Sequence, residues 1–197
     1  MAKLIGLTGG IGSGKTTIAK FFAEKGISIY IADHEAKQLM ESKTVQEKVK
    51  SVFGQEVFTN GRLDRPKLAA IVFNDPEKLK KLNEIVHPVV RTHFKNWVNE
   101  HQNEELLIYE SAILFESGHY KDFDCIITVT APLESRIARV LKRDETNRAE
   151  IERRINAQWT DSERIVKSDF EIENMDLKEA RDKVSDILKI LKIKQKE

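Results

Sequence analysis

A glycine-rich segment close to the N-terminus limits the possible folds of this chain more than any other feature. Residues 9–16 have the sequence GGIGSGKT, in which two glycines separated by four residues precede Lys15 and Thr16. An apolar run comes directly before the segment and a helical pattern follows it, which is the context of a phosphate-binding P-loop. That context favours nucleotide binding over a glycine-rich turn that merely joins a strand to a helix. The sequence therefore predicts an α/β fold with a site for a nucleoside triphosphate.

The positions of this loop have separate tasks. Glycines let successive N–H groups converge on a phosphate, where a Cβ atom would obstruct the approach. Lys15 would reach the β- and γ-phosphates, and the Thr16 hydroxyl is a hard oxygen ligand suited to Mg²⁺. We expect the ligands to be ATP and Mg²⁺. The expected nucleotide-binding residues are Gly10, Gly12, Ser13, Gly14, Lys15, Thr16 and Thr17.

Short apolar runs alternate with longer helical patterns along the chain, which favours a parallel sheet covered by helices. The strand candidates are residues 4–8, 27–31, 106–109, 125–130 and, more weakly, 170–172. The first helix is expected to run from the P-loop to about Lys25, because Gly26 is a favourable residue just past a helix end. We therefore predict a P-loop kinase fold with a parallel five-stranded sheet flanked by helices.

Two stretches depart from a simple alternation of strands and helices. A strand–helix–strand unit needs only about 30 residues, whereas residues 34–105 are far longer and contain helical patterns at 34–40, 45–53, 65–73 and 77–100. We predict a helical insertion there. Residues 134–167 form a second helical stretch, rich in arginine, that we interpret as a mobile element. The apolar stripe on the C-terminal helix is expected to pack on the sheet, and it consists of Ala180, Val184, Ile187, Leu188 and Leu191.

Polar residues follow several of the predicted strands, where open α/β sheets bind their ligands. Asp33 is the candidate general base for an attacking hydroxyl, and its alternative role is that of a helix N-cap. Glu110 could hold Mg²⁺ through water, or it could be a solvated carboxylate at a strand end. Asn174 follows the last strand candidate.

Four cationic side chains, Arg136, Arg139, Lys142 and Arg143, share one helix face by their spacing. Such a face suits a lid that closes over a triphosphate, and we favour this role for Arg139 and Arg143 above the other two. The alternative is a solvated helix paired with nearby acidic residues. Pro88 biases His87 away from helix, so one helix should end there and another begin. Taken alone, His87 is more typical of a structural histidine.

The composition limits the partners and the compartment. The chain has 33 basic and 32 acidic residues and a net charge of +1, which gives no reason to expect nucleic acid or an anionic membrane as a partner. Its single cysteine, Cys125, lies in an apolar run and favours a buried thiol in a reduced protein. There is no apolar run of about 20 residues and no signal-peptide pattern. We expect a cytoplasmic protein that acts as a monomer, with an oligomer left open.

With these residues identified, the chain resembles the dephospho-CoA kinase family over nearly its whole length. Residues 5–16, IGLTGGIGSGKT, are similar to the opening of that family almost letter for letter. Further residues fall in the order and spacing of the family, namely Ala32-Asp33 with Ala36, Leu82-Asn83 with His87-Pro88, Arg139 with Arg143-Asp144, Gln158, and Asp169 with Asn174.

The resemblance implies three parts: a nucleotide-binding core of residues 1–33, 101–134 and 166–197, a helical CoA-binding domain of residues 34–100, and a lid of residues 135–165. It implies transfer of the γ-phosphoryl group of ATP to the ribose 3′-hydroxyl of dephospho-CoA, the last step of coenzyme A biosynthesis. Asp33 would be the base and a substrate contact, with His87 as a second substrate residue. Lys15, Arg139 and Arg143 would take part in catalysis, and Asn174 would lie near the adenine.

Two positions depart from the family pattern. The family usually has Asp-Ala-Asp where this chain has Ile31-Ala32-Asp33, and Asp-x-Pro-Leu-Leu-Phe-Glu where residues 110–116 are ESAILFE. These departures concern the outer shell of the metal and the loop near the substrate. Two other functions remain as alternatives: a nucleoside or nucleoside monophosphate kinase, and a nucleotide-dependent switch that phosphorylates no acceptor.

Overall fold

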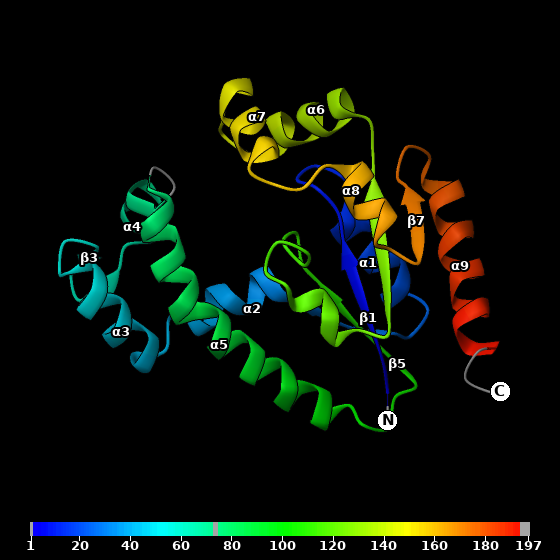
Figure 1. Cartoon of the computed structure of the whole chain (residues 1–197), viewed down its shortest axis with the longest axis horizontal. Helices are drawn as coiled ribbons and strands as arrows, with labels where there is room; N and C mark the ends of the chain where they lie inside the picture. Colours follow the sequence, from blue (N-terminus) through cyan, green and yellow to red (C-terminus); the bar gives the residue numbers. More distant parts are fainter. Residues whose placement is uncertain (1, 73–74, 194–197) are drawn as a thin grey trace. The chain divides into compact units, whose positions relative to one another are not determined.

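The computed structural model describes residues 2–72 and 75–193. The chain divides into two compact units, one of Met1–Ile31 with His101–Glu197 and the other of Ala32–Glu100. The first unit contains a parallel sheet and the second is mostly helical (Figure 1). The helical unit begins at Ala32, close to the start expected for the insertion. The predicted lid, residues 135–165, falls inside the first unit.

The sheet of the first unit has five parallel strands in the order β2-β5-β1-β6-β7. The predicted five-stranded parallel sheet is therefore confirmed. The central strands are buried along most of their length, as expected for a parallel sheet covered on both faces. Leu7 and Ile31 both pair in register with Glu110, so the end of β5 lies between the ends of its two neighbours. The strands are β1 (Lys3–Thr8), β2 (Ser28–Ile31), β5 (Leu106–Glu110), β6 (Cys125–Thr130) and β7 (Phe170–Glu173).

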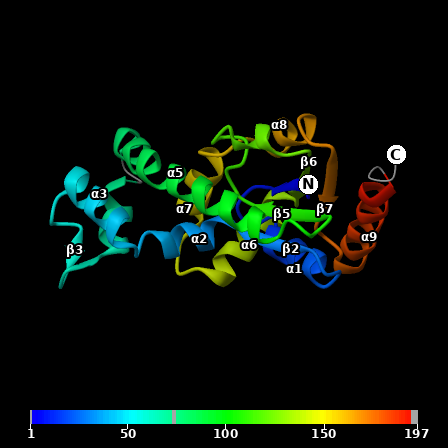
Figure 2. The ribbon, with the colours of Figure 1, turned by 90° about the horizontal axis from the view of Figure 1, so that it is seen from below.

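Helices cover both sides of this sheet. Helix α1 (Lys15–Ala23) and helix α8 (Asp161–Val166) lie on opposite sides of the strands (Figure 2). Helix α9 (Leu177–Ile193) packs beside α1 and β7. Every residue of its predicted apolar stripe is buried in the same core as the strands, which confirms that prediction. Cys125 is also buried, as expected.

The predicted helical stretch of residues 134–167 consists of three helices. These are α6 (Leu133–Arg143), α7 (Arg148–Asn156) and α8. Earlier in the chain, a short 3-10 helix, η1 (His119–Asp122), precedes β6. Each later helix has its own start signal. Asn147 caps α7 by accepting a hydrogen bond from the Glu150 backbone, and Thr160 with Glu163 forms a capping box for α8.

The helical unit has its own apolar core and one small hairpin. Val45, Val49 and Phe53 of α3 pack with Leu68 and Val72 of α4. The hairpin was not predicted, although its Asn60-Gly61 turn is a strong hairpin signal and both residues have positive φ. The predicted end of one helix at Phe73 lies outside the described residues. The elements are α2 (Ala32–Leu39), α3 (Lys43–Phe53), β3 (Phe58–Thr59), β4 (Arg62–Leu63), α4 (Arg65–Val72) and α5 (Pro76–Glu100).

Helix α5 runs without interruption through Pro88, so the predicted break at His87 is wrong. A proline inside a helix removes one backbone hydrogen bond and crowds the preceding turn, at a cost of about 3 kcal/mol. Here Val86 and Val90 are buried on either side of the proline, so packing stabilises the helix on both sides of it. Tertiary burial overrides the local preference at this position. Within the described residues, no helix has both the length and the apolar content of a membrane span.

Candidate active site

The phosphate loop joins β1 to α1, and its glycines are required by the conformation and by close neighbours. Gly14 caps α1 in the left-handed conformation, with φ 91° and ψ 26°. A Cβ atom at Gly14 would lie 2.0 Å from Nδ2 of Asn174, and one at Gly10 would lie 2.0 Å from Nη2 of Arg136. The side chains of Asn174 and Arg136 therefore pack directly against the loop and leave no space for a Cβ atom at Gly14 or Gly10.

Lys15 and Thr16 begin α1, where the first N–H groups have no acceptor within the helix. The buried Lys15 ammonium donates to the Gly10 carbonyl at 3.5 Å, so it folds back over the loop. The Thr16 hydroxyl donates to Oε2 of Glu110 at 3.5 Å, and Glu110 is only 4% exposed. The alternative of Glu110 as a solvated carboxylate is therefore wrong.

The oxygens of Thr16 and Glu110 fit a magnesium ion that is bound together with a nucleotide. Mg²⁺ prefers hard oxygen ligands and usually takes only one or two from the protein, with phosphate and water supplying the rest. Thr16 lies in the first turn of α1 and Glu110 at the end of β5, and together they place a hydroxyl next to a carboxylate. Among the described residues, no group of three or more His, Cys, Asp or Glu side chains could hold a metal without such help.

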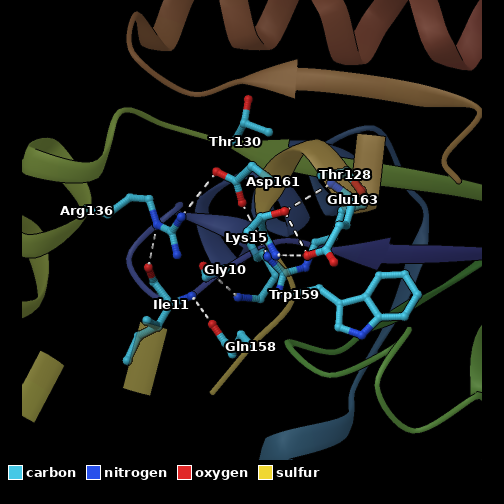
Figure 3. Close-up of polar contacts among 12 residues, drawn as sticks. Gly10, Ile11, Lys15, Thr128, Thr130, Arg136, Gln158, Trp159, Asp161 and Glu163 are labelled. Atoms are coloured by element: carbon cyan, nitrogen blue, oxygen red, sulfur yellow. Dashed lines mark hydrogen bonds and ion pairs between the residues drawn. The ribbon is translucent and has the colours of Figure 1, made fainter. Parts of the chain in front are cut away.

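Arg136 and Arg139 of α6 both contact the phosphate loop. Nε of Arg136 donates to the Ile11 carbonyl at 2.9 Å, and its Nη1 contacts Asp161 at 3.1 Å (Figure 3). Arg139 donates to the carbonyls of Gly12 at 3.4 Å and Ser13 at 3.2 Å. Burial lowers the pKa of the Arg136 guanidinium, and the neighbouring Asp161 carboxylate opposes that effect. The loop is thus flanked by two positive side chains.

Arg143 occupies a different environment from these two arginines. Its side chain is 63% exposed, and it donates to both carboxylate oxygens of Asp144, at 2.7 and 2.9 Å. This pairing raises the pKa of Arg143 and lowers that of Asp144. Sequence reasoning ranked Arg143 above Arg136, whereas the structure places Arg136 at the loop. The available signal was position, because the first turn of α6 directly follows β6 and therefore lies at the ligand edge of the sheet.

Asn174 and Gln158 hold the loop from two further directions. Asn174 is buried and donates from Nδ2 to the Ser13 carbonyl at 2.8 Å. Gln158 accepts a hydrogen bond from the Ile11 amide at 2.9 Å. Asn174 follows β7, as predicted, and its amide lies on the loop itself. Its Oδ1 atom and Oγ of Ser13 are buried with no hydrogen-bond partner among the described residues, so both could serve a bound ligand.

The remaining predicted residues belong to the helical unit. Asp33 is exposed in the first turn of α2, which begins at Ala32 directly after β2. The alternative of Asp33 as the N-cap is therefore wrong. His87 is half-buried and lines a groove of about 560 Å³ along α5, together with Asn83 and Arg91. Burial first, and then the charge of Arg91, lowers the pKa of His87 and favours the neutral imidazole.

The comparison with known proteins decides the family. A family model described as dephospho-CoA kinase matches residues 3–179. This chain belongs to the dephospho-CoA kinase family. The resemblance found in the sequence is thereby confirmed.

Individual relatives agree with this family assignment. A dephospho-CoA kinase from Fusobacterium nucleatum subsp. nucleatum is 45% identical over 172 residues, which cover 87% of this chain and 89% of that protein. A crystal structure from Thermus thermophilus matches with a TM-score of 0.87 at 34% identity, over 95% of this chain and 96% of that one. Dephospho-CoA kinase from Campylobacter jejuni matches with a TM-score of 0.69 over 96% of both chains. Because its identity is 24%, that likeness shows the shared fold alone.

One departure from the family pattern acquires a location from the sheet register. Ile31 stands where dephospho-CoA kinases usually carry the first acid of Asp-Ala-Asp, and it pairs in register with Glu110. An acidic residue at position 31 would therefore lie next to Glu110 on the adjacent strand. In this chain Glu110 is the acid at that edge of the sheet that contacts Thr16.

Proposed function

We propose that this chain transfers the γ-phosphoryl group of ATP to the ribose 3′-hydroxyl of dephospho-CoA, giving CoA and ADP. The observation that carries the proposal is the family match over residues 3–179, since it spans the phosphate loop, the helical unit and the arginine-bearing helices together. A P-loop alone would support nucleotide binding and leave the acceptor open.

The phosphate loop would bind and polarise the nucleotide. Lys15 would contact the β- and γ-phosphates, and the loop N–H groups would surround the β-phosphate. Thr16 would hold Mg²⁺ directly and Glu110 through water, and the ion would supply positive charge against the phosphate oxygens. The other residues proposed to contact the nucleotide are Gly10, Gly12, Ser13, Gly14, Thr17 and Asn174.

Arg139 would neutralise charge that develops during transfer, because it already lies against the loop. We propose residues 135–165 as a lid, and Arg143 would join Arg139 when that segment closes. The pairing of Arg143 with Asp144 on the exposed surface gives it a position from which it could move at little cost, since exposed ion pairs contribute about 1 kcal/mol or less.

Asp33 would accept the proton of the attacking hydroxyl, and its exposure makes the carboxylate accessible to a substrate. The helical unit, Ala32–Glu100, would bind dephospho-CoA, with His87 among its contacts. We further propose that the enzyme acts as a monomer in the cytoplasm, and gel filtration would test the first part of that statement.

The decisive experiment measures ADP release from ATP and Mg²⁺ with dephospho-CoA, adenosine or AMP as acceptor. Release that depends on dephospho-CoA, with CoA as product, is the expected result. Activity with adenosine or AMP alone would move the chain to the nucleoside or nucleoside monophosphate kinases. ATP binding without acceptor-dependent release would favour a nucleotide-dependent switch.

A further inference from the structure

A fully buried arginine, Arg164, is not among the residues proposed to contact nucleotide. Arg164 of the six-residue helix α8 has no exposed surface. Its Nη2 contacts Oε1 of Glu116 at 2.9 Å, and its Nη1 contacts Oδ1 of Asp161 at 3.3 Å. Glu116 lies in the loop that follows β5, so the pair connects that loop to α8.

The same ion pairs extend from α8 to the phosphate loop. The second oxygen of Asp161 contacts Nη1 of Arg136 at 3.1 Å, and Nε of Arg136 donates to the Ile11 carbonyl at 2.9 Å (Figure 3). Two arginines and two carboxylates therefore alternate along one path from Glu116 to Ile11, and their formal charges cancel. The path ends on a backbone carbonyl of the loop.

A second path from Glu116 leads to the backbone N–H of Ile11. The backbone N–H of Trp159 donates to Oε1 of Glu116 at 2.9 Å, and the Trp159 ring stacks on Phe115 with centroids 5.3 Å apart. The neighbouring residue, Gln158, accepts a hydrogen bond from the Ile11 amide at 2.9 Å. Glu116 is therefore connected both to Gln158, which binds the N–H of Ile11, and to Arg136, which binds its carbonyl.

Stability alone gives a poor account of this arrangement. Burying ions costs desolvation energy, and apolar side chains of similar size often serve stability as well or better. Nε of Arg164 and Oε2 of Glu116 are buried with no hydrogen-bond partner among the described residues, so the pair is not even fully satisfied. What the charges supply, and apolar groups could not, is a directed set of hydrogen bonds that orients Arg136 and Gln158.

We propose that Arg164 and Glu116 are positioning residues that orient the Ile11 peptide of the phosphate loop for the binding of nucleotide phosphates. This inference rests on the proposed function to the extent that the loop binds ATP and ADP. The two residues act through Arg136 and Gln158 and need no contact with the nucleotide themselves.

The test replaces both buried charges together, in the double variant Glu116→Leu with Arg164→Met. Asp161 and Arg136 keep one another as partners, so no buried charge is left alone. Because the Trp159 N–H loses its acceptor, we expect urea unfolding to show a lowered midpoint, with the variant still folded. Calorimetric titration with ADP should give a Kd raised about tenfold, because the loop loses the orientation of a supporting hydrogen bond. In steady state the KM for ATP should rise while the KM for the acceptor stays constant.

The matched control is the exposed ion pair of Arg148 and Glu134, which joins α6 to α7 on the surface. Glu134→Gln should leave the Kd for ADP unchanged. A double variant that folds and binds ADP with wild-type affinity would overturn the proposal. If the double variant fails to fold, Arg164→Lys is titrated instead, with a raised Kd expected and a wild-type Kd counting against the idea. Titration with ADP needs no acceptor, so it remains decisive even if dephospho-CoA proves not to be the substrate.

Discussion

The contact between the phosphate loop and Asn174 contributes to stability, and alanine substitutions at two glycines of the first unit can measure that contribution. Gly14 has a φ of +91° and Gly26 a φ of +82°, so an alanine at either position adopts a left-handed backbone. A Cβ at Gly14 would lie 2.0 Å from Nδ2 of Asn174, whereas one at Gly26 would meet no atom of the described chain within 4 Å. The two Gly→Ala variants therefore share the backbone cost and differ in the contact.

The expected magnitudes follow from this difference. Gly26→Ala should cost about 1 kcal/mol for the left-handed conformation. Gly14→Ala adds the rotation of Asn174 away from the Ser13 carbonyl, which breaks a 2.8 Å hydrogen bond of a buried amide. The Ser13 carbonyl still accepts from Arg139, so the added cost falls on the amide, at about 1–2 kcal/mol. The total for Gly14→Ala is then roughly 2–3 kcal/mol.

Urea unfolding with an unchanged m-value measures both variants on the same scale. ADP titration adds a second measure, in which Gly14→Ala should weaken binding and Gly26→Ala should not. Equal free energies of unfolding for the two variants, within roughly 0.5 kcal/mol, would refute the reasoning. In the background of Asn174→Ala, the extra cost of Gly14→Ala should disappear, because the obstructing amide is gone.

Four further changes test other parts of the molecule. Asp33→Asn should lower kcat by roughly 10²–10⁴-fold with ATP affinity nearly unchanged, and wild-type turnover would remove Asp33 from the mechanism. Lys15→Ala should weaken ATP use and abolish transfer together, and normal turnover would contradict the role of the loop lysine. The lowered pKa of His87 means that the folded state binds its proton less readily than the unfolded chain does. Stability should therefore fall as the pH drops below about 6.5, and His87→Gln should make that fall shallower in urea unfolding at pH 7 and pH 5; equal slopes would exclude His87 as a cause. Thr160→Ala removes the capping box of α8 and should destabilise the protein by about 1 kcal/mol, whereas an unchanged unfolding midpoint would mean that the cap contributes nothing.

Local patterns were sufficient for a large part of the fold. The order of glycines, Lys15 and Thr16 predicts the loop because the chemistry depends on residues that are adjacent in the chain. The strands and the C-terminal apolar stripe were predictable because their periods match a buried strand and a half-buried helix. The hairpin at Asn60-Gly61 was equally local, and its turn signal could have been used.

Other features depend on partners that are distant in sequence. Pro88 predicts a helix break locally, but α5 continues through it, with Val86 and Val90 buried on either side. Arg136 and Arg143 share one helix face, so their spacing alone does not show which of them contacts the phosphate loop. The packing of α6 against the loop decides that Arg136 is buried there. No local pattern distinguishes Arg164 from the other arginines of residues 134–167, and its partner Glu116 lies 48 positions away.

By itself, the sequence determined the phosphate loop, the parallel α/β class, the helical insertion and the family, since these are written in contiguous motifs and periodic patterns. The tertiary structure decided the strand order, the contact of Glu110 with Thr16, and the set of side chains that hold the loop in shape. Those outcomes depend on which strands have their carboxyl ends side by side at one edge of the sheet. They also depend on buried charges, each of which needs an oppositely charged partner. The chain brings such partners together only when it is folded.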